Sequence, residues 1–338
     1  MSGNSPLYLV ILAAGKGTRM KSNKAKVLHE VFYAPMVHHV LNATTLLQAK
    51  KTIVVVGHQR NTVEKSLSEF SAKTVVQDEQ LGTGHAVLCA EPAIDKMDGC
   101  VMILCGDTPL IRPETLQAMV NQHKSQNSTL TVMTTILDNP THYGRIITEQ
   151  NGNVHSIVEE KDADIEQKKI QEINAGIYCI DTQFLFSHLK NIGTNNSQGE
   201  VYLTDIVTQA VAENLPVHKY VNPASKDVLG VNSRLELSQA HQELQMRRNH
   251  DLMAEGISMI QPETIQISPE SSLGRDVSIH PGVEITGTSS VASGCTLNAG
   301  ILLNNVSIGE GSTIGAYSCL KDCEVPENAT ILPHSQAC

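Results

Sequence analysis

The sequence has no tryptophan, and aromatic residues make up only 3% of its 338 residues. No apolar run approaches the roughly 20 residues that a membrane-spanning helix needs. Residues 1–6 lack the basic start of a secretory signal peptide, and the apolar run 7–14 is better explained as a buried strand. We therefore expect a cytoplasmic chain that does not enter a membrane.

Basic charge and paired cysteines are also scarce. The 25 lysines and arginines are outnumbered by 35 acids, and the formal net charge of -10 argues against nucleic acid as the main partner. The eight cysteines are scattered without a C-x-x-C pair, so neither a disulfide framework nor a zinc motif is indicated. Cys105 and Cys179 lie in apolar runs, where cysteine acts as a small hydrophobic residue. We expect reduced thiols.

Short apolar runs alternate with longer amphipathic ones in the first part of the chain. The predicted strands cover residues 7–12, 53–56, 74–77, 101–104 and 130–136, and the predicted helices between them include 35–50 and 112–123. Fully apolar strands separated by helices indicate an α/β fold, a Rossmann-like domain with a mostly parallel, doubly wound sheet. Ligands of such sheets bind beyond the carboxyl ends of the strands, where we expect the chemistry.

The last part of the chain has a different period. Past residue 272 an apolar residue recurs at every sixth position, with one shift of phase, at Ile279, Ile285, Val291, Leu297, Leu303, Ile308, Ile314 and Leu320. A hexapeptide repeat is typical of a left-handed parallel β-helix, of which about three coils fit; short antiparallel strands are the alternative. Residues 233–256 predict a linker helix that ends at Gly256. We therefore expect three parts: 1–232, 233–256 and a short β-helix over 257–338.

A glycine-rich turn follows the first predicted strand, in the stretch "LAAGKGTRMKSNKAK" (12–26). It does not match G-x-G-x-x-G, because Met20 holds the third glycine position, and it also lacks the Walker A spacing. Glycines still let a ligand approach the backbone, and amide groups at such a turn suit phosphate oxygens. Five basic residues lie here: Lys16, Arg19, Lys21, Lys24 and Lys26. A solvated basic loop is the alternative, but the position after a strand favours a small anionic ligand.

This stretch and seven further segments, in order along the chain, resemble the sugar-nucleotide pyrophosphorylases and, among them, the bacterial N-acetylglucosamine-1-phosphate uridyltransferases of the GlmU family. The further segments are "QDEQLGTGHAV" (77–87), "CGDTPLI" (105–111), "YGRII" (143–147), "IVEEKDA" (157–163), "EINAGIY" (172–178), "GEVYLTDIV" (199–207) and "GVNSRLEL" (230–237). The resemblance implies that N-acetylglucosamine-1-phosphate attacks the α-phosphorus of UTP and that pyrophosphate leaves. It also implies Mg²⁺ as the cofactor.

The resemblance assigns roles to residues of these segments. The catalytic residues would be Arg19 and Lys26, which would face the departing pyrophosphate. The nucleotide-binding residues would be Leu12, Ala13, Ala14, Gly15, Gln77, Gly82, Thr83, Cys105, Gly106 and Asp107. The sugar-binding residues would be Gly144, Glu159, Asn174, Thr204 and Asn232, and the metal ligands Asp107 and Asn232. Taken alone, Asp107 has a turn residue as its alternative, Thr83 a helix cap and Glu159 a solvated acid.

Further expectations follow from the same resemblance. The β-helix of this family assembles as a trimer, so we expect a homotrimer. Longer relatives house an acetyltransferase in β-helix coils that have no match here, and we expect no such activity. Ala25 stands where the family usually has proline, which predicts a more mobile loop and weaker UTP binding. Two rival functions stay open: transfer of another nucleotide to another sugar phosphate, and a non-catalytic scaffold of the same fold.

Overall fold

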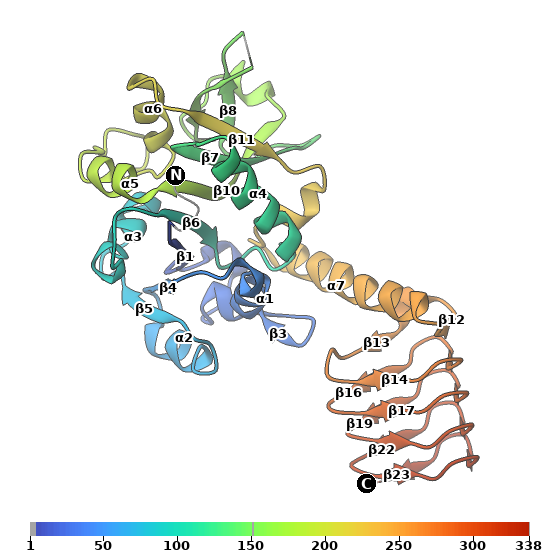
Figure 1. Ribbon diagram of the computed structural model, residues 1–338. Helices are drawn as coiled ribbons and strands as arrows, with labels where there is room; N and C mark the ends of the chain where they lie inside the picture. Colours follow the sequence, from blue (N-terminus) through green and yellow to red (C-terminus); the bar gives the residue numbers. More distant parts are fainter. Residues whose placement is uncertain (1–4, 151, 338) are drawn as a thin grey trace. The chain divides into compact units, whose positions relative to one another are not determined.

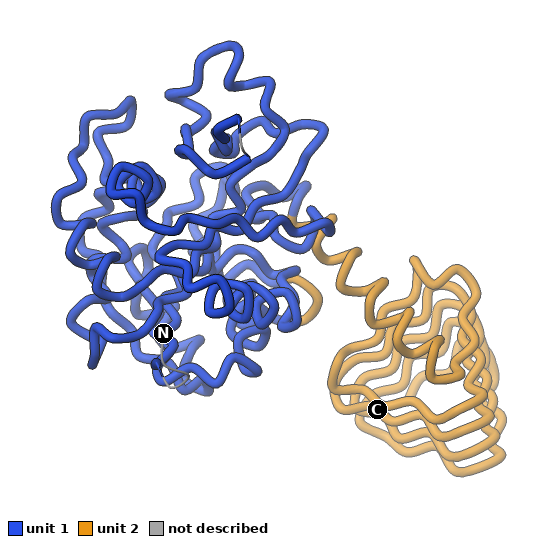
Figure 2. The backbone as a smooth tube through the Cα atoms, turned by 45° about the horizontal axis from the view of Figure 1, so that its top comes forward, with its two compact units in different colours: residues 1–30, 34–236 blue, residues 31–33, 237–338 orange. Residues whose placement is uncertain are grey.

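The computed structural model describes residues 5–150 and 152–337. The chain divides into two compact units, one of residues 1–30 and 34–236 and the other of residues 31–33 and 237–338, coloured separately in Figure 2. Two apolar clusters form the core of the first unit, and a third forms the core of the second. Each unit therefore has the separate core that is expected of a domain.

The first unit is built on a nine-stranded sheet, shown in the upper part of Figure 1. Its path runs β11–β7–β10–β6–β1–β4–β5, and a hairpin of β8 and β9 is attached through β10. The strands are β1 (Leu7–Ala13), β4 (Lys51–Val56), β5 (Lys73–Val76), β6 (Cys100–Cys105), β7 (Leu130–Ile136), β8 (Arg145–Thr148), β9 (Val154–Val158), β10 (Glu172–Asp181) and β11 (Val217–Val221). β1 is parallel to β4 and β6, whereas β10 is antiparallel to β6 and β7. The carboxyl ends of β1, β4, β5 and β6 therefore share one edge.

Helices cover both faces of this sheet. They are α1 (Met36–Ala43), α2 (Arg60–Ser66), α3 (Thr83–Leu88), α4 (Pro113–Ser125), α5 (Thr182–Leu189) and α6 (Asp205–Ala212). Successive residues of β1 point into different cores: Leu9 belongs to the cluster with α1 and α4, and Val10 to the cluster with α3, α5 and α6. This arrangement confirms the predicted doubly wound α/β fold.

The second unit contains a left-handed parallel β-helix of three sheets and most of α7 (Arg234–Ala254). The first sheet contains β12 (Ser258–Met259), β15 (Ser278–Ile279), β18 (Thr296–Leu297), β21 (Thr313–Ile314) and β24 (Thr330–Ile331). The second contains β13 (Gln266–Ile267), β16 (Glu284–Thr286), β19 (Leu302–Asn304), β22 (Cys319–Lys321) and β25 (Gln336–Ala337). The third contains β14 (Ser272–Leu273), β17 (Ser290–Val291), β20 (Ser307–Ile308) and β23 (Glu324–Val325). The apolar residues of the repeat are buried inside, which confirms the predicted hexapeptide β-helix.

Two predictions of extent were wrong. Among the described residues the β-helix has five, five and four strands on its three faces, more than about three coils, because successive coils repeat after only 17 or 18 residues. The helix predicted over 35–50 ends as α1 at Ala43. Thr44 and Thr45 donate their hydroxyls to carbonyls of the preceding turn, and such bonds compete with helix continuation.

The cysteines of residues 5–150 and 152–337 are seven, and all carry free thiols. Three of them belong to neighbouring strands of the central sheet, Cys100 and Cys105 to β6 and Cys179 to β10. No helix in the described part of the chain combines the length and the apolar content that crossing a bilayer requires.

Candidate active site

A cavity of about 400 Å³ lies at the carboxyl ends of β1 and β6, the edge of the sheet where the sequence predicts the chemistry. Most residues predicted to bind the nucleotide, hold the metal or act in catalysis line it: Leu12, Ala13, Ala14, Gly15, Arg19, Lys26, Gln77, Gly82, Thr83, Cys105, Asp107 and Asn232. Gly106 is not in the lining, and its N–H donates to the Leu12 carbonyl at 2.9 Å. The structure thus brings distant segments to one place, and the roles of the residues stay predictions.

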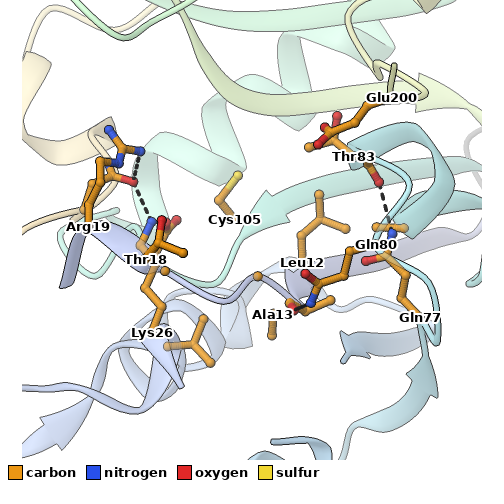
Figure 3. A pocket seen from close by; sticks show the side chains of 18 residues that line it. Leu12, Ala13, Thr18, Arg19, Lys26, Gln77, Gln80, Thr83, Cys105 and Glu200 are labelled. Carbon is orange, nitrogen blue, oxygen red and sulfur yellow. Dashed lines mark hydrogen bonds and ion pairs between the residues drawn. The ribbon is translucent and has the colours of Figure 1, made fainter. Parts of the chain in front are cut away.

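The cationic groups and the amide groups of this cavity lie on different sides. In Figure 3 the cationic side chains of Arg19 and Lys26 lie on one side, and the amides of Gln77 and Gln80 lie on the opposite side. Leu12 and its strand neighbours separate the two groups. A ligand with an anionic end and a flat polar end fits this arrangement, since cations attract phosphates and amides pair with base edges.

The glycine-rich turn adopts a backbone that other residues would strain. Gly17 has a φ of 62°, in the left-handed region, and precedes a short 3₁₀ turn over Thr18–Met20. A Cβ at Gly17 would lie 2.6 Å from Cβ of Lys26. Glycine at this position therefore lets the Lys26 side chain pass close to the turn and reach the cavity.

Side chains of three segments meet at the cationic side. Lys26 Nζ donates to Asp107 Oδ2 and also to Asn232 Oδ1, the latter at 2.6 Å. Arg19 donates to the same Asn232 oxygen at 2.7 Å. Asn232 is itself fixed, because its Nδ2 donates to the Gly230 carbonyl at 2.9 Å. The Lys26 and Asp107 side chains are only 13% and 18% exposed, so solvent screens their attraction weakly.

Asp107 and Asn232 also fit a magnesium ion. One carboxylate oxygen and one amide oxygen point at the same ammonium, so a cation placed between them contacts both. Mg²⁺ prefers a few protein oxygens and keeps its other positions for water and substrate phosphates. The donor set therefore matches the metal that the sequence predicts, and Lys26 holds the position of the cation in this structure.

The amide side contains a nearly buried glutamine. Gln77 is 5% exposed, and its Nε2 contacts the Gly82 carbonyl and His85 Nδ1, both at 3.1 Å. Gln80 Nε2 donates to the Ala14 carbonyl at 2.7 Å and so ties this side to the glycine-rich turn. With its nitrogen occupied, Gln77 has its carbonyl oxygen left to accept a hydrogen bond from a ligand.

Four predicted sugar-binding residues form a group outside the cavity lining: Gly144, Glu159, Asn174 and Thr204. Thr204 Oγ1 donates to Glu159 Oε1 at 3.3 Å, and the Asn174 N–H donates to the Gly144 carbonyl at 2.9 Å. β10 is irregular directly after Asn174, and Gly176 there has a φ of 73°. Such irregularities re-aim side chains next to active sites. Cys105 contacts the Gly176 carbonyl through Sγ at 3.6 Å, so this group borders the cavity at Cys105.

Glu159 is an acid in unfavourable surroundings. Burial raises its pKa, and the nearby acids Asp162, Asp205 and Glu200 add to the effect. Within the described residues no lysine or arginine pairs with it. A buried carboxyl that lacks a cation is a candidate binding group, because a ligand can supply the hydrogen bonds that the protein withholds.

Some pocket residues were missed at the sequence level. Gln80 and Glu200 line the cavity and lie inside matched segments, so a signal for them was available. Gln59 lies outside the lining of this cavity and had no such signal, yet its Oε1 accepts from the Ala25 N–H at 2.9 Å and its Nε2 donates to the Asn23 carbonyl. Gln59 therefore fastens the loop before Lys26, at the position where we expected a mobile segment.

Comparison with known proteins agrees with this geometry. A family model described as nucleotidyl transferase matches residues 8–243, which include the whole cavity lining. The fold and the family match together define a nucleotidyltransferase enzyme.

Similar proteins identify the family within the nucleotidyltransferases. A protein of Desulfotalea psychrophila (strain LSv54 / DSM 12343) named bifunctional protein GlmU is 51% identical over 333 residues, 98% of each chain. Proteins of the same name from Trichlorobacter lovleyi and Geobacter metallireducens are 41% and 44% identical, over 96% and 91% of this chain and 71% and 64% of their own. The chain belongs to the GlmU family of nucleotidyl transferases.

Proposed function

We propose that this enzyme makes UDP-N-acetylglucosamine and pyrophosphate from UTP and N-acetylglucosamine-1-phosphate. The observation that carries the proposal is the meeting of Lys26, Arg19, Asp107 and Asn232 at one side of a cavity that has Gln77 at its other side. A triphosphate occupies the cationic side and the base the amide side. The two ends of UTP then match the two ends of the cavity.

Gln77 reads the base in this proposal. Uracil presents an N3–H donor, and the Gln77 carbonyl oxygen is the acceptor left over by the contacts of its nitrogen. Gly82 has a φ of 109°, and a Cβ there would lie 2.5 Å from the Val201 carbonyl. The segment around Gly82 thus packs closely against Val201, which supports a flat slot for a pyrimidine.

Lys26 and Arg19 neutralise the negative charge of the phosphates in this proposal. An oxygen of the sugar phosphate forms a bond to the α-phosphorus, the bond from this phosphorus to the bridging oxygen breaks, and pyrophosphate takes the electron pair. Lys26 and Arg19 exchange Asp107 and Asn232 for the oxygens of the departing group. The nucleophile is already an anion, so no general base is required, and positioning and charge neutralisation supply the catalysis.

Mg²⁺, held by Asp107 and Asn232, would supply charge neutralisation and orientation of the phosphates. Cys105 lines the cavity, but it is not a nucleophile here. Burial, and secondarily Asp107, raises the pKa of its thiol to about 12, so the sulfur stays protonated. Direct transfer between phosphates, without a covalent enzyme intermediate, is therefore the step that the residues favour.

Glu159 and Asn174 hold the sugar in this proposal, with Gly144 and Thr204 beside them. The half-buried Glu159 carboxylate accepts from sugar hydroxyls, which repays part of its desolvation. The β-helix serves assembly of a homotrimer. Exposed apolar side chains on it support this role: Leu302 is 46%, Tyr317 63% and Leu332 71% exposed. Light scattering coupled to size exclusion tests the trimer separately from the activity.

The first experiment measures pyrophosphate release from UTP, N-acetylglucosamine-1-phosphate and Mg²⁺, with EDTA as the control. Release that EDTA abolishes supports the proposal. A panel of nucleotides and sugar phosphates follows, and a higher kcat/KM for another pair would replace the substrates but keep the class. Absence of release across the whole panel would refute the proposed catalysis.

A further inference from the structure

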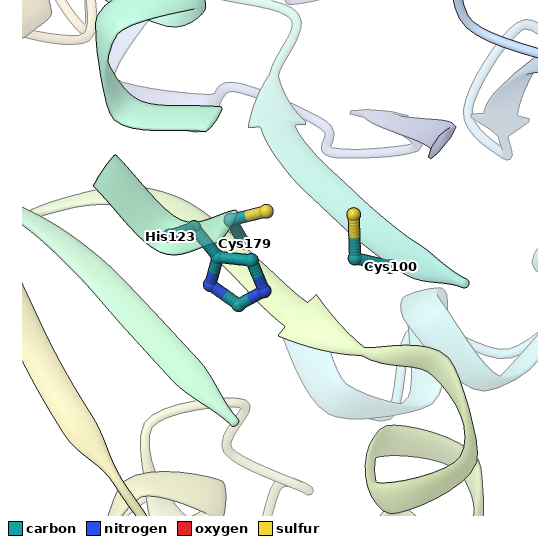
Figure 4. A group of neighbouring side chains, drawn as sticks. All are labelled: Cys100, His123 and Cys179. Atoms are coloured by element: carbon teal, nitrogen blue, oxygen red, sulfur yellow. The ribbon is translucent and has the colours of Figure 1, made fainter. Parts of the chain in front are cut away.

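Three potential metal ligands lie close together between the central sheet and a helix that packs on it, away from the candidate active site. They are Cys100 at the start of β6, Cys179 in β10 and His123 in α4. One ligand atom of each lies within 4.8 Å of the other two, and all three residues are buried. Figure 4 shows the two thiols on adjacent strands with the imidazole beside them. Within residues 5–150 and 152–337 no other trio of His, Cys, Asp or Glu meets this criterion.

The imidazole of His123 is held on one side and left open on the other. Its Nδ1 lies 2.9 Å from Thr131 Oγ1, whereas its Nε2 has no hydrogen-bond partner among the described residues. His123 is 0% exposed, so water does not replace the missing partner. Burial lowers the pKa of His123 to about 4, which keeps the ring neutral. An unpartnered ring nitrogen in such a place is costly unless a ligand uses it.

A disulfide does not explain the two thiols. In the antiparallel register of β6 and β10, Cys179 is opposite Met102 and Cys100 is opposite Asp181. The two cysteines are therefore diagonal neighbours, whose Cα atoms are about 7–8 Å apart in such sheets. Disulfides need Cα atoms within about 6.8 Å. Thiols that are near one another but badly placed for a bond suit a shared ligand between them.

We propose that Cys100 Sγ, Cys179 Sγ and His123 Nε2 bind a thiophilic d¹⁰ cation, Zn²⁺ or Cu⁺. Two metal–sulfur bonds and one metal–nitrogen bond form, the two thiol protons leave to solvent, and no oxidation state changes. With Zn²⁺ the two thiolates and the neutral imidazole make an uncharged site, which suits a buried position. Thr131 acts as the outer partner that orients the ring by accepting from Nδ1–H.

The proposed site is separate from the nucleotide cavity. β6 runs from Cys100 to Cys105, so its two ends lie about 17 Å apart. A second cavity, of about 430 Å³, is lined by Leu7 and Lys124 among others. Leu7 pairs with Cys100 across β1 and β6, and Lys124 follows His123 in α4. This cavity therefore lies next to the amino end of β6, although none of the three proposed ligands lines it.

The test titrates the full reduced chain with Zn²⁺ and, in a separate arm, with Cu⁺, each against a competing chelator. One ion is expected to bind per chain, and its affinity to fall about 100-fold per unit of falling pH, because two thiols must lose protons. Co²⁺ as a probe is expected to give the sulfur-to-cobalt charge-transfer band that thiolate ligands produce. The arm with the tighter binding identifies the ion.

Variants separate this site from other thiols. His123→Gln and Cys179→Ser are each expected to weaken binding at least 100-fold and to abolish the rise in Tm that the metal gives the unaltered chain. The control Cys319→Ser/Cys323→Ser removes the closest cysteine pair of the β-helix and is expected to bind as tightly as the unaltered chain. If Cys179→Ser does not fold, His123→Gln and the Co²⁺ band decide. Equal binding by His123→Gln, no binding in either arm, or a mass lower by two hydrogens at Cys100 and Cys179 would overturn the proposal.

Discussion

Strand β6 carries different chemistry at its two ends. Beyond its carboxyl end Asp107 faces an open cavity and accepts a hydrogen bond from Lys26, which also donates to Asn232. At its amino end Cys100 faces the buried interior with another thiol and an imidazole whose Nε2 has no partner among the described residues. Hard oxygen donors that are open to solvent suit a ligand that binds and dissociates in each reaction cycle. Buried sulfur and nitrogen donors suit a metal ion that remains bound. One strand can thus position a transient site and a permanent one, because it holds them apart.

The largest expected effect concerns the open end. Lys26→Met removes the ammonium that faces the phosphates in the proposed reaction, and we expect kcat for pyrophosphate release to fall about 10²–10³-fold, the range for loss of one preorganised charge-stabilising group. Lys24→Met is the matched control, because Lys24 pairs with Glu30 at 3.4 Å and lies outside the cavity lining. A Lys26→Met enzyme that keeps more than a tenth of the activity would contradict the role of Lys26.

The next largest effect concerns the proposed metal site at the amino end of β6. Thr131→Val removes the partner of His123 Nδ1 with little change of shape, and we expect metal affinity to fall about 10–100-fold, as for other outer partners of a ligating histidine. Competition with a chelator measures it. Thr135→Val is the control, because Thr135 is a buried threonine of the same strand that bonds to the Asn222 carbonyl instead. Equal affinities of the two variants would show that Thr131 does not orient the ring.

Glu159 sharpens the comparison, because it is a half-buried acid near the carboxyl-end cavity that no lysine or arginine of the described residues pairs with. Its pKa is raised in the folded state, so the fold favours the protonated form. Stability is therefore full below the unfolded-state pKa of about 4.3 and is lost as pH rises through the raised pKa. Glu159→Gln stays neutral, and we expect it to be more stable than the unaltered chain at pH 8 and equal to it at pH 4.

Two measurements check Glu159→Gln. Urea midpoints at pH 4 and pH 8 test the sign, and a variant that is less stable at pH 8 would be inconsistent with the raised pKa. The same variant is expected to raise the KM for the sugar phosphate about 10-fold, since hydrogen bonds to a charged acceptor are lost. An unchanged KM would place the sugar away from Glu159.

The smallest effect is expected from Ala25→Pro. Ala25 has a φ of -52°, which proline accepts, so the substitution stiffens the loop without strain. It also removes the N–H that donates to Gln59 Oε1 at 2.9 Å. A gain of about 0.4–1 kcal/mol opposes a loss of about 0.5–1.5 kcal/mol, so we expect the KM for UTP to change less than about sixfold.

The double variant with Gln59→Ala tests this account of Ala25. Gln59→Ala alone is expected to raise the KM for UTP, and its effect is expected to shrink when Ala25→Pro has already removed the donor. A KM that Ala25→Pro lowers tenfold would instead restore the simpler expectation of a loose loop. The sequence supported that expectation because the Gln59 side chain, 34 residues away from Ala25, belongs to no recognisable motif.

Features that depend on residues close together in the sequence could be predicted, and features that depend on residues far apart could not. The β-helix could be predicted because its signal is local: residues such as Ile285 and Leu297 recur at a fixed spacing and are buried by the adjacent coils. The parallel sheet could be predicted for a similar reason, from apolar runs of strand length. β13 keeps this period, since Ile267, Leu273 and Ile279 follow one another at a spacing of six, whereas Met259 of β12 lies eight residues before Ile267 and so out of step.

The edge of the sheet that holds the candidate site could be predicted from the strand pattern, but the distant residues that meet there could be assigned only through the family resemblance. Lys26 lies 81 residues from Asp107 and 206 residues from Asn232, and no spacing rule connects groups so far apart. The cluster at the amino end of β6 was not predicted at all. The apolar surroundings of Cys179 correctly predicted that it is buried. Only the register of β6 and β10 and the packing of α4 on the sheet bring His123 close to the two thiols.

Lys26 gives the ligand-free pocket an internal counter-ion. Its ammonium already satisfies the two oxygens that a divalent cation needs, so a free cation gains little by competing for them. A polyphosphate offers the ammonium a second partner and draws it away as it arrives. Local charge would then stay balanced before and after binding, so in the proposed reaction we expect the cation and the nucleotide to bind as one electrically coupled unit rather than one after the other.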